Sequence, residues 1–218
     1  MKLTHFGHAC VLAEFAGQSG PTRLLLDPGA YSTGFEELRD LDAVLVTHEH
    51  QDHLDLGRLA ALLEANPAAR LIADPGSAAR IQEAGLVHQA VVPGETLTIA
   101  GVTVEVHGGE HAVIHPKLPC VHNNCYLLAG RLFHPGDAFT VPPQPVEVLL
   151  LPTGAPWMKV SEGIDYLQAV APAIAVPIHQ AGLAQVHQQL HYQLFNAFAP
   201  AGTTVRVLEH GAVTELPA

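Results

Sequence analysis

The 218 residues carry a formal net charge of −11, and their ten Lys and Arg residues are scattered, so a basic face for nucleic acid is not expected. No apolar run reaches the roughly 18–20 residues of a membrane span, and the first residues lack the pattern of an export signal. We therefore expect a cytoplasmic protein with no nucleic-acid or membrane partner. Its length suits one domain over residues 1–218.

Short apolar segments alternate with turns and helical periodicity along the first half of the chain. The patterns predict helices at 55–67 and 76–85 and strands at 2–7, 9–16, 22–29, 42–47 and 69–74. Asp55 is the expected N-cap of the first helix, and Gly85 is expected to close the second.

The second half repeats this rhythm. It predicts helices at 161–172, capped by Ser161, and at 184–198, a final hairpin within 203–216, and strands at 88–93, 95–101, 102–108, 125–130, 131–137, 146–152 and 173–179. No change of composition marks a linker between the halves. One domain made of two similar halves, with two packed sheets flanked by helices, fits this order best.

The segment "VTHEHQDHLD" (46–55) places three histidines and two carboxylates directly after a buried strand. In an extended chain His48, His50 and Asp52 lie on one face and His53 on the other. A turn near Asp52 would bring His53 into the same site. The segment could then bind two neighbouring metal ions, with His48 and His50 on one and Asp52 and His53 on the other.

Further candidate ligands follow other strands of both halves. They are Asp27, His111, Asp137 and His179. Strand ends fix the backbone while loops let the side chains converge. His107 and His115 are alternatives to His111, which is favoured because it lies past Gly108 and Gly109, where the strand is expected to break. Imidazole and carboxylate without thiolate suit zinc, manganese or iron.

The stretch "THEHQDH" resembles the Thr-His-x-His-x-Asp-His signature of the metallo-β-lactamase superfamily, and the other candidate ligands follow in that family's order. The pieces "GHAC", "HPGDAF" and "AVPIH" are similar to its small-chain branch of ascorbate-6-phosphate lactonase-like proteins and uncharacterised metal-dependent hydrolases. The resemblance implies an α+β fold, a four-layer αββα sandwich of two mixed sheets. It also implies a first metal on His48, His50 and His111, a second on Asp52, His53 and His179, and Asp137 as the bridge.

The same resemblance implies a hydrolase with two divalent metal ions, with zinc expected first and manganese or iron as alternatives. A hydroxide bridging the ions would attack a small ester, lactone or phosphoester, and Asp52 would orient it as a catalytic residue. The alternatives are a non-catalytic metal-binding or sensor protein and a thioester hydrolase of the glyoxalase II kind. All three cysteines precede Asp137, which disfavours the lactam-hydrolysing members that use a cysteine ligand after it.

Residues around these ligands complete the prediction. The resemblance also implies that Asp27 orients a ligand histidine from outside, and we expect His8 and His134 to lie beside the site. The expected wall of a small-molecule pocket comprises His115, Asn123, Trp157 and Lys159, although Trp157 could instead anchor its loop to the core. A homo-oligomer and a pairing of Cys120 with Cys125 stay open.

Overall fold

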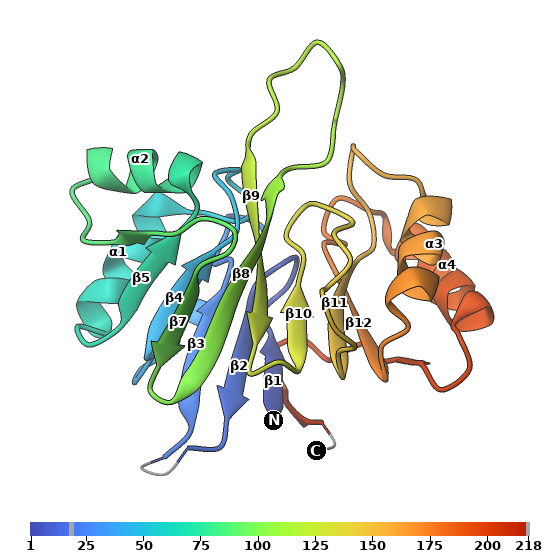
Figure 1. Cartoon of the computed structure of the whole chain (residues 1–218), viewed down its shortest axis with the longest axis horizontal. Helices are drawn as coiled ribbons and strands as arrows, with labels where there is room; N and C mark the ends of the chain where they lie inside the picture. The colour runs from blue at the N-terminus through green and yellow to red at the C-terminus, as the bar shows by residue number, and fades with distance from the viewer. Residues whose placement is uncertain (18–19, 217–218) are drawn as a thin grey trace.

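The computed structural model describes residues 1–17 and 20–216 of the chain. Two mixed β-sheets lie at the centre, and Figure 1 shows α1 and α2 on one side of them and α3 and α4 on the other. The predicted four-layer αββα sandwich is therefore confirmed.

The first sheet has the strand order β14-β1-β2-β3-β4-β5-β6. Neighbours are antiparallel from β14 to β3 and parallel from β3 to β6. The strands are β1 (Lys2–His5), β2 (Val11–Phe15), β3 (Thr22–Leu26), β4 (Ala43–Val46), β5 (Arg70–Ala73), β6 (Gln89–Ala90) and β14 (Val213–Glu215). Strand β4 is buried along its whole length, as its continuous apolar run predicts.

The second sheet has the order β13-β12-β11-β10-β9-β8-β7. Neighbours are parallel from β13 to β10 and antiparallel from β10 to β7. Its strands are β7 (Thr96–Ile99), β8 (Val102–Glu110), β9 (His122–Leu128), β10 (Leu132–His134), β11 (Val148–Pro152), β12 (Ile174–Ile178) and β13 (Thr204–Val205). The strand break expected at Gly108 and Gly109 is absent, because both glycines pair with β9.

The helices are α1 (Leu56–Ala65), α2 (Pro75–Glu83), α3 (Val160–Val170), α4 (Gln185–Phe198) and the short 3₁₀ helix η1 (Phe35–Glu37). Asp55 caps α1 by accepting from two backbone N–H groups, as predicted. The prediction for Ser161 was wrong. Helix α3 begins one residue earlier, and Glu162 reaches back to accept from the backbone N–H of Lys159 at 2.6 Å, which makes Lys159 the N-cap.

Three clusters of buried apolar side chains hold the four layers together. One contains residues of both sheets, such as Leu45 and Leu150, and fills the space between them. A second packs Leu59 and Leu62 of α1 against the first sheet, and a third packs α3 and α4 against the second sheet. Each sheet is thus covered on both faces.

The last residues do not form the predicted hairpin. Strand β13 extends the second sheet beside β12, whereas β14 crosses over to pair with β1 in the first sheet. The two strands therefore belong to different sheets, a distinction that local turn signals do not carry. Within the described ranges, no helix is long and apolar enough to cross a membrane.

Candidate metal centre

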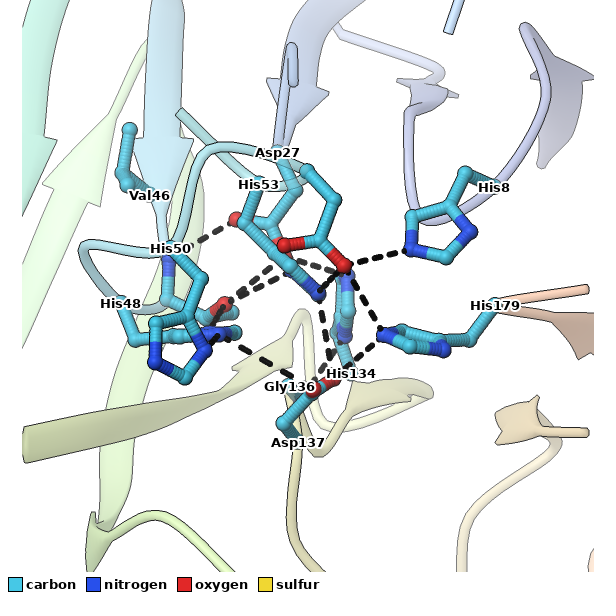
Figure 2. Close-up of polar contacts among 12 residues, drawn as sticks. His8, Asp27, Val46, His48, His50, His53, His134, Gly136, Asp137 and His179 are labelled. Carbon is cyan, nitrogen blue, oxygen red and sulfur yellow. Dashed lines mark hydrogen bonds and ion pairs between the residues drawn. The ribbon is translucent and has the colours of Figure 1, made fainter. Parts of the chain in front are cut away.

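The predicted ligands converge at one edge of the sandwich, where strands of both sheets end. Asp27 follows β3, the histidine-rich segment follows β4, and His111, Asp137 and His179 follow β8, β10 and β12. Figure 2 shows the side chains of His48, His53 and His179 pointing toward Asp137. The site is thus shared between the two sheets.

A tight turn brings His53 into the site, as the sequence predicts. The backbone N–H groups of His53 and Leu54 both donate to the carbonyl of His50, at 3.0 and 2.9 Å. Gly29 allows the neighbouring loop to lie against this turn, since a Cβ at Gly29 would stand 1.9 Å from the carbonyl oxygen of Asp52. The Glu49 side chain lies instead beside Gly76 of α2, away from the cluster.

The ligand atoms form two groups, and in each group they lie within 4.8 Å of one another. The first group is His48, His50, His111 and Asp137, and the second is His8, Asp52, His53 and His179. These groups divide the segment as its spacing suggests, with His48 and His50 in one and Asp52 and His53 in the other.

Asp137 stands between the two groups. Its Oδ1 lies 3.1 Å from both His53 Nε2 and His179 Nε2. Its Oδ2 lies 3.4 Å from His111 Nε2 and 3.9 Å from His48 Nε2. Ligand atoms on one tetrahedral zinc ion, with bonds of about 2.0–2.1 Å, would be about 3.3 Å apart. One carboxylate oxygen therefore faces each group at ligand-like spacing.

The other ring nitrogens determine which histidines can ligate a metal. Each Nδ1–H donates to an oxygen: His53 to Asp27 Oδ2 at 2.7 Å, His111 to the Ala112 carbonyl at 2.5 Å, and His179 to the Gly154 carbonyl at 2.8 Å. Each Nε2 is then the nitrogen that points into the site, and it offers its lone pair to a metal ion once any proton on it has left. These three Nε2 atoms and Asp137 Oδ1 are buried without a hydrogen-bond partner, which fits metal binding.

Asp27 orients His53 from behind. Its carboxylate is fully buried and accepts from the Thr47 backbone N–H at 2.8 Å and the Thr47 hydroxyl at 2.7 Å, as well as from His53. His134 Nε2 lies 3.1 Å from it. Burial alone would raise the pKa of Asp27, but His53 and His134 outweigh it and hold that pKa well below its usual range.

His8 belongs to the second group by distance, but both of its ring nitrogens already make hydrogen bonds. Its Nδ1 accepts from the backbone N–H of Ala181 at 3.3 Å, so its Nε2–H donates to Asp52 Oδ2 at 3.0 Å. Burial lowers the pKa of His8 to about 4, which leaves the ring neutral at neutral pH. His8 therefore orients Asp52 and has no free lone pair for a metal.

Two residues predicted to line the pocket, Trp157 and Asn123, contact Asp137 and position it. The Trp157 indole N–H donates to Asp137 Oδ2 at 2.8 Å, and its ring packs edge-on against Phe139. Asn123 is fully buried, accepts from the Asp137 backbone N–H at 2.9 Å and donates to the Pro135 carbonyl. These contacts with Asp137 join residues that are distant in the chain, and no local pattern predicts them.

The other predicted site and pocket residues differ in burial and in their distance from the ligand groups. His134 is buried against Asp27, and Lys159 is exposed at the start of α3. His115 is exposed on the loop after β8, and His107 stays on β8 near Glu105, so His111 is the one of these histidines that reaches the cluster. Both Cys120 and Cys125 are free thiols.

Three residues of the site adopt left-handed backbone conformations that side chains disfavour. The φ angles are 50° at His8, 45° at Asp27 and 61° at His179. Each costs on the order of 1–3 kcal/mol and persists only where surrounding contacts enforce it. The fold therefore holds these side chains in place by contacts of the chain itself.

Known proteins resemble this chain over most of its length. Residues 2–179 match the family described as "Beta-lactamase superfamily domain". Protein Rv0786c of Mycobacterium tuberculosis is 53% identical over 88% of this chain and 90% of its own length. A "UPF0173 metal-dependent hydrolase" of Methanosphaerula palustris is 30% identical over 82% of this chain and 83% of its own.

A solved structure shows the same fold. Igni18, described as a metallo hydrolase of Ignicoccus hospitalis, superposes with a TM-score of 0.74 at 20% identity over 99% of both chains. Together with the family match over residues 2–179, the fold and the histidine-rich strand end establish the family. This chain belongs to the metallo-β-lactamase superfamily.

Proposed function

We propose that this chain is a metal-dependent hydrolase that holds two divalent ions, zinc before manganese or iron, and cleaves a small ester, lactone or phosphoester. The relatives named metal-dependent hydrolases support the reaction class. The proposal of two ions rests on the position of Asp137, because its two carboxylate oxygens face separate groups of histidines.

The residues divide between the ions as follows. His48, His50 and His111 would hold one ion, Asp52, His53 and His179 the other, and Asp137 would bridge them. Such a pair of ions lowers the pKa of a shared water toward neutrality and polarises the bond under attack. Thr47 orients residues of both ligand groups. Its hydroxyl donates to Asp27, which orients His53 of the second group, and accepts from Nδ1–H of His48 in the first group at 3.0 Å.

Asp52 is the catalytic residue in this proposal. It is the one carboxylate of the two groups that reaches solvent, with 19% of its side chain exposed against 4% for Asp137. Burial would raise its pKa, but the hydrogen bond from His8 and the charge of His53 hold the pKa well below its usual range. It is therefore ionised, and with Oδ2 held by His8 it would orient the attacking water while it binds the second ion.

The test combines metal analysis with a panel of esters, lactones and phosphodiesters. We expect close to two ions per chain, and hydrolysis that a chelator abolishes. Asp52→Asn should lower kcat by about 10²–10⁴-fold. Glu49→Gln is the matched control, because Glu49 lies in the same segment and points to α2, and it should retain activity. Metal binding without hydrolysis of any member would instead indicate a metal-binding or sensor protein.

A further inference from the structure

A pocket of about 350 Å³ lies beside the first group of ligands. His50 and His111 form one wall, and the rest of the lining comes from residues 112–116 and 118–121. This is the loop between β8 and β9, which Figure 1 shows rising beyond both sheets. The volume is within the range of small-molecule sites.

The lining is mostly apolar, with His50, His111, His115 and Cys120 as its polar side chains. Val113, Ile114 and Leu118 are large apolar side chains, 62%, 37% and 55% exposed. No Lys, Arg, Asp or Glu is among the described residues that line the pocket. Apolar side chains gathered at the mouth of a site indicate a surface that binds apolar groups.

The base of the pocket is fixed to the metal centre. The backbone N–H of Ala112 donates to the Asp137 carbonyl at 2.8 Å, and that of His111 to the Val121 carbonyl at 3.0 Å. Because His50 and His111 belong both to the ligand group and to the pocket wall, a group bound in the pocket has its attached functional group at the ligands.

We propose that this pocket binds an uncharged aliphatic group of the substrate, so that the substrate class is a neutral carboxylic ester or lactone with an aliphatic chain. This rests on the proposed function. Among the described lining residues an anionic substituent would find no Lys or Arg to pair with, and His50 and His111 would be engaged by the proposed ion. An aliphatic chain would remove its own surface and that of Ile114 and Leu118 from water.

The first experiment uses metal-loaded protein and nitrophenyl esters from acetate to octanoate, with the succinate monoester and an octyl phosphodiester as anionic arms. We expect kcat/KM to rise about fourfold per added methylene until the pocket is full. The double variant Ile114→Ser, Leu118→Ser should flatten that rise, so that the octanoate ester is hydrolysed little faster than the acetate ester. Val186→Ser, on an exposed position of α4, is the control and should keep the rise. A flat series in the wild type, or preference for an anionic arm, overturns the proposal.

A second measurement does not depend on turnover. Cys120 lines the pocket and is exposed, whereas Cys10 and Cys125 are buried, so one thiol reports on the pocket. Octanamide should slow the reaction of Cys120 with a thiol reagent more than butanamide does, and the serine double variant should lose the difference. Equal rates would refute the pocket assignment even in an active enzyme. Protection by octanamide without hydrolysis of any ester would refute the hydrolase proposal and leave an apolar binding site.

Discussion

Replacing Asp27 by Asn should weaken both the folded state and metal binding. The two side chains have nearly the same shape, but the amide is uncharged and carries an NH₂ group. In the wild type the Asp27 carboxylate accepts three hydrogen bonds, two from Thr47 and one from His53, and His134 Nε2 lies 3.1 Å from it. An NH₂ facing His53 would either oppose its Nδ1–H or force the proton onto Nε2, and the second outcome removes the lone pair that ligates.

The expected loss of stability is large because Asp27 is completely buried. Breaking a buried charge pair by removing one partner costs about 3–5 kcal/mol, and Asp27 has no exposed surface through which water could compensate. Losing a carboxylate that orients a ligand histidine typically lowers metal affinity by about 10–100-fold. We expect both effects together in Asp27→Asn.

Urea unfolding of the metal-free protein measures the first effect, and competition with a chromogenic chelator measures the second. Asp165→Asn, at an exposed position of α3, is the control and should change the free energy of unfolding by less than about 0.5 kcal/mol. If Asp27→Asn unfolds at the wild-type urea concentration and binds metal equally well, the assignment of Asp27 as the residue that orients His53 is refuted.

Three further predictions concern a thiol, a helix cap and a glycine. Only Cys120 should react with Ellman's reagent in the native protein, and all three thiols in urea; rapid reaction of more than one native thiol would contradict the burial of the others. Burial raises the pKa of Asp74, the N-cap of α2, so the ionised carboxylate destabilises the folded state at neutral pH and Asp74→Asn should unfold at an equal or higher urea concentration. The difference should vanish below about pH 4, where the wild-type carboxyl is protonated in both the folded and the unfolded state. A variant less stable than the wild type at neutral pH would contradict this. Gly136→Ala should lose about 2–4 kcal/mol of stability because φ is 59° and the new Cβ would stand 2.1 Å from Asn123 Oδ1, and wild-type urea unfolding would disprove the steric argument.

The layered fold could be predicted because each element has its own signal. The apolar run of β4 and the capping carboxylate of Asp55 are local patterns, and the structure confirms both. The predicted final hairpin was wrong because β13 pairs with β12, the strand before α4, whereas β14 pairs with β1 at the other end of the chain. Ser161 was wrong because Glu162, one residue later, supplies the competing contact.

In the candidate site, too, local patterns could be predicted from the sequence and long-range contacts could not. The spacing of His48, His50, Asp52 and His53 is a local property, and it implies two neighbouring ligand groups before any fold is known. The hydrogen bond from Trp157 to Asp137 joins residues 20 positions apart, and that from His8 to Asp52 joins residues 44 positions apart. Such contacts follow from the packing of the sheets, which residue spacing does not encode.

The placement of the ligands on both sheets has a mechanical consequence. His48 and His53 extend from the first sheet, whereas His111, Asp137 and His179 extend from the second, so ions at this edge would act as a cross-link between them. A ligand that binds only the folded chain stabilises it by about 4 kcal/mol when its free concentration is about 1,000 times its Kd. The temperature of unfolding would then rise with metal concentration, so the unfolding temperature of the protein would report how much metal is bound.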